Sequence, residues 1–146
     1  MRIDLGRRGD YAIRAGLMLA RHTDGGLVKS REVAATMAIP ERFVIHILAD
    51  LVRAGLVEST AGPRGGYRLA GSPEQTSVLA LVEATEGDLR ARTCPLRGGP
   101  CPSEEVCVLH EDWLEAQEAF LGRLAATSLR SLADRDDGDV ARPAPV

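Results

Sequence analysis

Apolar side chains recur at intervals of three and four in three successive stretches of the first half of the chain. This spacing predicts a first helix over Asp10–His22, which the turn-forming segment Asp24-Gly25-Gly26 ends. A second, short helix is expected over Ser30–Met37, with Ser30 as its N-cap. The third begins at Pro40 and runs to about Arg53. Its apolar positions form the clearest pattern: Phe43, Val44, Ile47, Leu48, Leu51 and Val52.

A β-hairpin is predicted after the third helix. Leu56–Thr60 and Tyr67–Leu69 are short β-prone runs, and the segment between them, Ala61–Gly66, is rich in Gly and Pro. Three helices followed by a hairpin is the element order of a winged helix-turn-helix, whose second paired helix enters the DNA major groove. We therefore expect a mainly α fold with a small β-hairpin, in which residues 1–70 bind DNA. An ordinary helical domain with a solvated arginine face is the alternative.

The second half of the chain contains two further helical stretches. Gln75–Glu86 is a predicted helix closed by Gly87, and a long helix is expected from about Ser103 toward Leu132. The stretch Thr93–Pro102 between them is too rich in Gly and Pro for a regular element. Residues 134–146 are acidic and then rich in Pro and Ala, which predicts a disordered tail.

The long predicted helix has a near-heptad row of apolar residues, which is typical of helix-on-helix association. The row consists of Leu109, Trp113, Ala116, Phe120 and Leu124. Packing within the same chain is the alternative, but a helix this long at the end of a small domain has few partners there. We expect residues 71–133 to supply a dimerisation helix, and a homodimer would place two DNA-reading heads on a near-palindromic site.

Composition and charge add to this interpretation. Hydrophobic residues make up 45% of the 146 residues and aromatic residues only 3%, so aliphatic side chains must fill the core. The chain shows no bilayer-spanning apolar run and no signal peptide, so we expect a cytoplasmic protein without a membrane partner. Residues 1–70 hold 11 Lys and Arg against 7 Asp and Glu, whereas residues 71–146 hold 7 against 14. A basic first half favours a polyanionic partner such as DNA.

Basic residues lie where a winged helix-turn-helix contacts double-stranded DNA. Arg42 and His46 are placed to hydrogen-bond base edges or phosphates near the start of the third helix, and Arg53 shares their outward face. Arg64 occupies the tip of the hairpin between glycines. Phosphate neutralisation is expected from Lys29, Arg31 and Arg68, which would make DNA affinity depend strongly on salt.

The chain has three cysteines, and all lie in one segment. Six residues separate Cys94 from Cys101, five separate Cys101 from Cys107, and His110 follows three positions after Cys107. In a reducing compartment, clustered thiols indicate metal binding or redox sensing rather than a disulfide scaffold. Thiolates are preferred ligands of iron–sulfur clusters and of zinc. His110, one helical turn after Cys107, is a candidate fourth ligand on the same helix face.

Three other interpretations of the cysteines remain. A structural zinc held by three Cys and one His is chemically reasonable, and so is a thiol switch without metal. A catalytic Cys107–His110 pair is disfavoured because the sequence shows no orienting group and no oxyanion-hole motif, so we do not expect an enzyme.

Several motifs together resemble iron–sulfur regulators of the IscR/NsrR type, the Rrf-two family of winged-helix proteins. The match covers Met1 to about Leu132, and the wing motif combined with the three cysteines is its most specific part. The stretches that carry the resemblance are Met1-Arg2-Ile3, Asp10-Tyr11-Ala12, Ile39–Val44 with Ile47-Leu48, Leu51–Val57, Gly62–Tyr67 and Cys107–His110.

The resemblance implies a homodimer that binds a 2Fe–2S or 4Fe–4S cluster and represses or activates genes. We expect a repressor that senses redox state, nitric oxide or iron–sulfur status through this cluster. Cys94, Cys101 and Cys107 match the ligand cysteines of the family. His110 matches the fourth ligand of IscR-like members, and Asp10 matches the acidic ligand that the partner subunit supplies in NsrR-like members. Ile45 stands where IscR-like proteins often have a polar or acidic residue that contacts a base. This difference implies a DNA target that differs from the IscR site.

Overall fold

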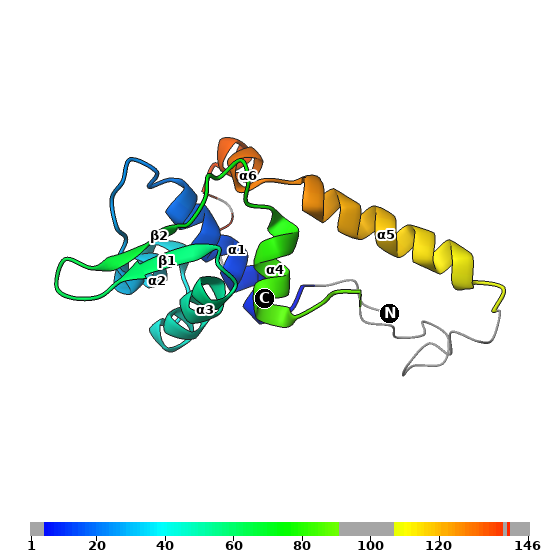
Figure 1. The fold of residues 1–146 in the computed structure, drawn as a ribbon, viewed down its shortest axis with the longest axis horizontal. Coiled ribbons are helices and arrows are strands. Elements are labelled where there is room, and N and C mark those ends of the chain that lie inside the picture. Colours follow the sequence, from blue (N-terminus) through cyan, green and yellow to red (C-terminus); the bar gives the residue numbers. More distant parts are fainter. Residues whose placement is uncertain (1–4, 91–106, 139, 141–146) are drawn as a thin grey trace.

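Six helices and one β-hairpin make up residues 5–90, 107–138 and 140, which are the residues that the computed structural model describes (Figure 1). The elements are α1 (Arg7–Ala20), α2 (Ser30–Met37), α3 (Glu41–Arg53), β1 (Val57–Thr60), β2 (Gly66–Leu69), α4 (Val78–Glu86), α5 (His110–Ala126) and α6 (Leu129–Arg135). Figure 1 shows α1–α4, the hairpin and α6 gathered into one body, from which α5 extends away. The prediction of a mainly α fold with a small hairpin is confirmed.

Helices α2 and α3 form the helix-turn-helix pair. Ala38, the C-cap of α2, adopts a left-handed conformation with φ of 53°, and this lets the chain reverse toward α3. Pro40 is the N-cap of α3, so this helix matches the predicted range within one residue. The N-cap of α2 is Lys29 rather than Ser30, because the Glu32 carboxylate reaches back and accepts the Lys29 backbone N–H at 3.0 Å.

The hairpin has the antiparallel register expected of a wing. Val57 pairs with Leu69 and Glu58 pairs with Arg68. Val28, ahead of α2, adds a third segment because its backbone N–H and C=O exchange hydrogen bonds of 2.9 and 2.8 Å with Tyr67. A Cβ on Gly65 would lie 1.9 Å from the backbone oxygen of Thr60, so the tight wing turn has room only for glycine there.

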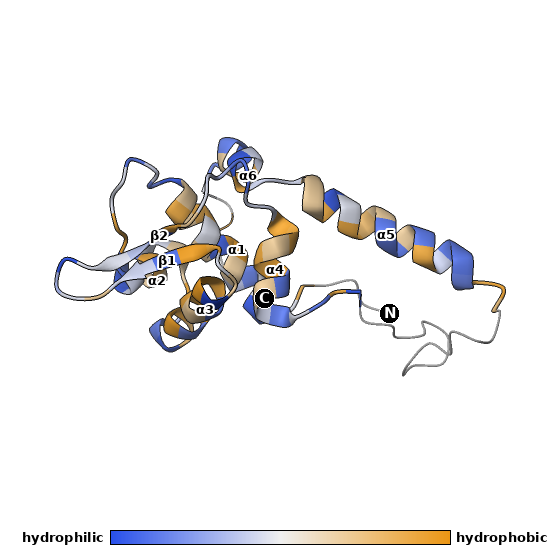
Figure 2. Ribbon diagram, viewed as in Figure 1, coloured by the Kyte–Doolittle hydropathy of each residue, from blue (hydrophilic) through white to orange (hydrophobic). Residues whose placement is uncertain are grey.

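Aliphatic side chains of α1, α2, α3, α4 and α6 fill the core. Leu17 of α1, Leu48 and Leu51 of α3 and Leu81 of α4 are completely buried. Helix α4 packs closely on α1 at Gly16, where a Cβ would lie 2.9 Å from a methyl carbon of Leu81. Figure 2 shows the apolar faces of these helices turned toward one another. Each such buried side chain contributes about 1.5–3 kcal/mol to folding, so the body has its own hydrophobic core.

Helix α4 begins three residues later than its apolar spacing predicted. Its N-cap is Ser77, whose hydroxyl accepts the backbone N–H of Ala80 at 3.1 Å. Its C-cap is Gly87, at the position where the sequence predicted the end.

The single long helix predicted up to Leu132 is wrong, because the chain is broken between α5 and α6. Thr127 is extended, and its carbonyl accepts the backbone N–H of Val78 at 2.9 Å. The Ser128 hydroxyl then caps α6 by accepting the Ser131 N–H at 3.1 Å. This break lets Leu129 turn inward, where it is completely buried. The predicted start near Ser103 lies outside the described residues, and α5 begins at His110.

Helix α6 continues to Arg135, two residues into the stretch where the sequence predicted a disordered tail. Beyond it, the Asp136 carboxylate accepts backbone N–H groups of Gly138 and Val140 and forms an ion pair with Arg21, next to the end of α1. Burial raises the pKa of Asp136, but the Val140 and Gly138 hydrogen bonds and the Arg21 charge outweigh it, so the pKa lies below its ordinary value. Residues 141–146 lie outside the described residues.

Candidate DNA-reading surface and cysteine segment

The outward face of α3 carries the predicted base-reading side chains. The residues on this face are Arg42, Ile45, His46, Ala49 and Arg53, and all are exposed. The opposite face is buried against α1, α2 and α4. Because α3 follows α2 in a helix-turn-helix and lies beside the hairpin, its outward face is the one that such folds insert into the major groove.

Arg42 is held beside the helix by an aromatic pair. Its guanidinium carbon lies 4.9 Å from the centre of the Phe43 ring. The Phe43 ring in turn packs on Tyr11 of α1, with 5.9 Å between the ring centroids. Stacking uses the flat face of the guanidinium, whereas its N–H groups lie in its plane and can still bind a base edge or a phosphate.

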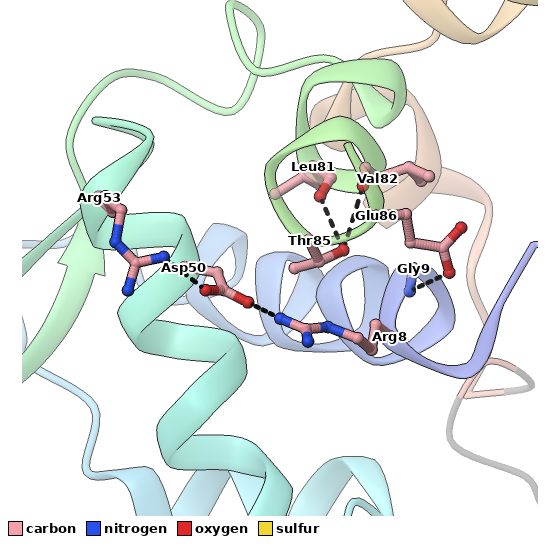
Figure 3. A network of polar contacts seen from close by, with 8 residues as sticks. All are labelled: Arg8, Gly9, Asp50, Arg53, Leu81, Val82, Thr85 and Glu86. Atoms are coloured by element: carbon pink, nitrogen blue, oxygen red, sulfur yellow. Dashed lines mark hydrogen bonds and ion pairs between the residues drawn. The ribbon is translucent and has the colours of Figure 1, made fainter. Parts of the chain in front are cut away.

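Arg53 is bound within the chain. The Asp50 carboxylate accepts a hydrogen bond from Arg53 Nη1 at 2.9 Å and forms a second ion pair with Arg8 of α1 (Figure 3). The Asp50 side chain is only 11% exposed, so two guanidinium groups share one largely buried carboxylate. Sequence reasoning missed Asp50 and Arg8, although the i, i+3 spacing of Asp50 and Arg53 was a visible signal.

The same network reaches α4 through the start of α1. Glu86 Oε1 accepts the backbone N–H of Gly9 at 2.9 Å (Figure 3). A carboxylate there satisfies an N–H that has no partner within its own helix, and it interacts favourably with the helix dipole. The N-terminal turn of α1 is thereby fastened to both α3 and α4.

The wing presents one arginine and holds two other basic residues in place. Arg64 is exposed in the turn between β1 and β2. Lys29 Nζ donates to the carbonyl oxygen of Pro63 at 2.7 Å, which braces the turn against the start of α2. Arg68 Nε pairs with Glu58 Oε2 across the two strands at 2.9 Å. Arg31 is exposed on α2.

Cys107 lies directly before α5. Its side chain is half-buried, and its Sγ accepts the backbone N–H of Leu109 at 3.4 Å. The His110 backbone N–H donates to the Cys107 carbonyl at 3.0 Å. Cys107 therefore lies just ahead of α5 and not within the same helix as His110, because the helix begins only at His110. Cys94 and Cys101 lie outside the described residues.

Asp10, the other candidate fourth ligand, is paired within α1. Arg14 donates to both of its carboxylate oxygens at 3.0 and 2.9 Å, and Arg14 also binds the Met37 carbonyl at 3.2 Å. The Asp10 side chain is nevertheless 45% exposed, so one side of the carboxylate faces outward. Over residues 5–90, 107–138 and 140, no three His, Cys, Asp or Glu side chains gather as a metal site.

Much of the apolar surface of α5 is uncovered. Leu121 is its one fully buried residue, whereas Leu114 is 44% and Phe120 40% exposed. The predicted row of Leu109, Trp113, Ala116, Phe120 and Leu124 is half-buried or exposed along its whole length. Figure 2 shows apolar positions interspersed with polar ones along α5, which extends away from the body.

A family profile described as Rrf2, an iron-dependent transcriptional regulator, matches residues 5–135. The chain belongs to the Rrf2 family. It is therefore a DNA-binding transcriptional regulator and not an enzyme. Among the Rrf2 relatives, the IscR regulator of Pectobacterium carotovorum is 29% identical, and the match covers 94% of this chain and 88% of that protein.

Solved structures agree with this family. IscR of T. potens has a TM-score of 0.74 at 25% identity, with coverage of 97% of this chain and 94% of that one. CymR of B. subtilis, described as its global cysteine regulator, has a TM-score of 0.77 with coverage of 93% and 100%, but at 24% identity it shows the shared fold alone. The described helices of this Rrf2 protein include none with the length and apolarity needed to cross a bilayer.

Proposed function

We propose that this Rrf2 regulator senses redox state, nitric oxide or iron–sulfur status through a cluster held by Cys94, Cys101 and Cys107. The observation that carries the proposal is the position of Cys107: a half-buried thiol directly before α5, at the end of this helix that lies away from the body (Figure 1). Three thiols within one segment supply the soft donors that an iron–sulfur cluster requires, so the donor chemistry fits. When bound, such a cluster would supply a centre that oxidants or nitric oxide can alter.

The polar network gives the cysteine segment a physical route to the DNA-reading helix. The segment follows α4 in the chain, and Glu86 at the end of α4 holds the start of α1. Arg8, the residue before Gly9 in α1, forms an ion pair with Asp50 of α3. A change that displaces the end of α4 would therefore alter the position of α3. Regulation of this kind requires two states with different DNA affinity.

The fourth ligand is His110 or Asp10 in this proposal. His110 lies three residues after Cys107, and its backbone N–H donates to the Cys107 carbonyl. Asp10 would reach the cluster from a partner subunit with the carboxylate side that Arg14 leaves exposed. Zinc in place of iron, or a thiol switch without metal, is the alternative sensor chemistry.

We further propose that two copies associate through the uncovered apolar face of α5 and bind a near-palindromic operator as a repressor. On each copy, Arg42 and His46 would contact bases. Arg64, at the tip of the wing, would contact the DNA backbone. Arg31 would neutralise a phosphate. Lys29, Arg53 and Arg68 have partners in the chain, so we assign them mainly to shaping this surface, with phosphate contact as their secondary role.

Anaerobic purification followed by iron and sulfide analysis tests the sensor. We expect a coloured protein with visible absorbance that oxygen or nitric oxide changes, together with a change in affinity for operator DNA. Cys107→Ser should lose iron because a hydroxyl is a poor substitute for thiolate. The matched control is Val108→Ala, which truncates the neighbouring, 98% exposed side chain and should keep the iron.

The same measurements identify the alternatives. A colourless protein with stoichiometric zinc would show that the site is a zinc centre. A metal-free protein whose DNA affinity responds to reversible thiol oxidation would show a thiol switch. Either result would contradict the cluster proposal while leaving the DNA-reading role in place.

A further inference from the structure

Ile45 is the apolar exception on an otherwise polar or small-residue surface. Four other aliphatic residues of α3, namely Val44, Ile47, Leu48 and Leu51, are buried, whereas Ile45 is 57% exposed. A single exposed aliphatic residue is common on protein surfaces and by itself indicates nothing. The position of Ile45 is what matters: it lies three residues after Arg42 and four before Ala49, so all three share the outward face of the helix.

The rest of the exposed apolar surface lies elsewhere in the molecule. Among the described residues, the other exposed large apolar side chains are Leu5, Val108, Leu114 and Phe120. These belong to the N-terminal segment and to the α5 region, and none lies on α2, α3 or the hairpin. Beside Ile45 stand Arg42 and His46 on α3, and Arg31 and Arg64 are exposed on α2 and the wing. A basic surface of this kind favours DNA as the group that covers Ile45.

We propose that Ile45 recognises the C5-methyl group of a thymine in the major groove, so that each half-site carries a T·A pair opposite Ile45. The inference rests on the proposed DNA-reading role of α3 and adds the identity of one base. Thymine is the only base with a methyl group in the major groove, where it also presents the O4 acceptor; the other three bases are read there through hydrogen-bond donors and acceptors. Ile45 offers no hydrogen bond, and covering a polar base edge with it would leave that edge without a partner.

The expected size of the effect follows from the burial of one methyl group. Removing a buried methyl costs about four-fold in affinity for each half-site. If the two half-sites contribute independently, losing both methyl groups weakens binding of a dimer by roughly fifteen-fold.

The experiment uses DNA duplexes that the full-length protein enriches from a randomised pool. Each thymine is replaced in turn by deoxyuridine, which removes the methyl and keeps the base pairing. We expect about four-fold weaker binding at one thymine per half-site, and we expect Ile45→Ala to bind the thymine and uracil duplexes equally. Ile45→Val, which keeps a branched aliphatic side chain, should retain the preference. A 5-methylcytosine·G pair at that position should bind more tightly than an unmodified C·G pair.

Several results would overturn the proposal. If replacing thymine by uracil weakens binding at none of the positions, Ile45 does not read a methyl group. The same conclusion follows if the uracil effect persists unchanged in Ile45→Ala. If Ile45→Ala alters the oligomeric state while DNA discrimination stays intact, the side chain belongs to a protein contact. These outcomes leave DNA reading by α3 intact, whereas a failure to enrich any duplex would remove that role and this inference together.

Discussion

Helices α3 and α5 both carry apolar residues at helical spacing, but they differ in what covers those residues. In α3, Leu48 and Leu51 are completely buried within the chain. In α5, Leu121 is buried, whereas Leu114 is 44% and Phe120 is 40% exposed. The comparison shows that helical spacing identifies the apolar side chains that favour burial. It does not say whether they are buried by the same chain or by a partner.

The two regions therefore have different sources of stability. The body packs α1, α3 and α4 around one aliphatic core and has its own polar network at the start of α1 (Figure 3). Helix α5 contacts the body chiefly through α4 and extends away from it (Figure 1). Most of the stability of a helix in a protein comes from packing of its apolar face, so α5 gains most from an additional partner. Two substitutions, Leu48→Ala and Phe120→Ala, test this division, and a third tests the wing.

The largest effect is expected from Leu48→Ala in the core of the body. Removing a completely buried leucine side chain leaves a cavity, and we expect the free energy of unfolding to fall by about 2–5 kcal/mol. Chemical denaturation followed by circular dichroism measures the loss. The matched control is Ile45→Ala, which truncates a 57% exposed aliphatic side chain one turn away on the same helix. The control should change stability by no more than about 0.5 kcal/mol. Similar losses for both would show that α3 is not packed as described.

The second effect concerns association through α5. Phe120→Ala removes a large exposed aromatic side chain, and we expect the dissociation constant of the dimer to rise by about 30-fold. Sedimentation equilibrium over a range of protein concentrations measures this constant.

Leu121→Ala is the neighbouring control for the α5 prediction. Leu121 is buried within the chain, so its truncation should lower the free energy of unfolding of the folded chain itself. A Phe120→Ala protein that dimerises as tightly as the wild type would refute the proposed role of this face.

The same comparison explains how far sequence reasoning succeeded. Helix α3 was predicted within one residue because its start and its apolar pattern are local properties of the sequence. The break at Thr127 was missed because it depends on a backbone hydrogen bond to Val78, about fifty positions earlier in the chain. Sequence periodicity carries no information about such a distant pairing.

The candidate site was predicted to a similar extent. Exposure of Arg42 and His46 followed from helical geometry and is confirmed. The partners of Arg53 and Arg68 were missed because a basic side chain looks the same in sequence whether it faces DNA or a carboxylate. The Asp50 network was missed because it joins helices that only the tertiary fold brings together.

The smallest of the three effects is expected at the wing. Arg64 is exposed at the turn, whereas Lys29 and Arg68 beside it have partners in the chain. Arg64→Ala should weaken DNA binding by about five-fold per subunit and reduce the slope of log affinity against log salt by about 0.9 per subunit. Fluorescence anisotropy at several salt concentrations measures both values. Arg64→Lys preserves the charge and should keep most of the slope. An unchanged slope in Arg64→Ala would place Arg64 away from the phosphates, and the wing would then make no electrostatic contribution to DNA binding.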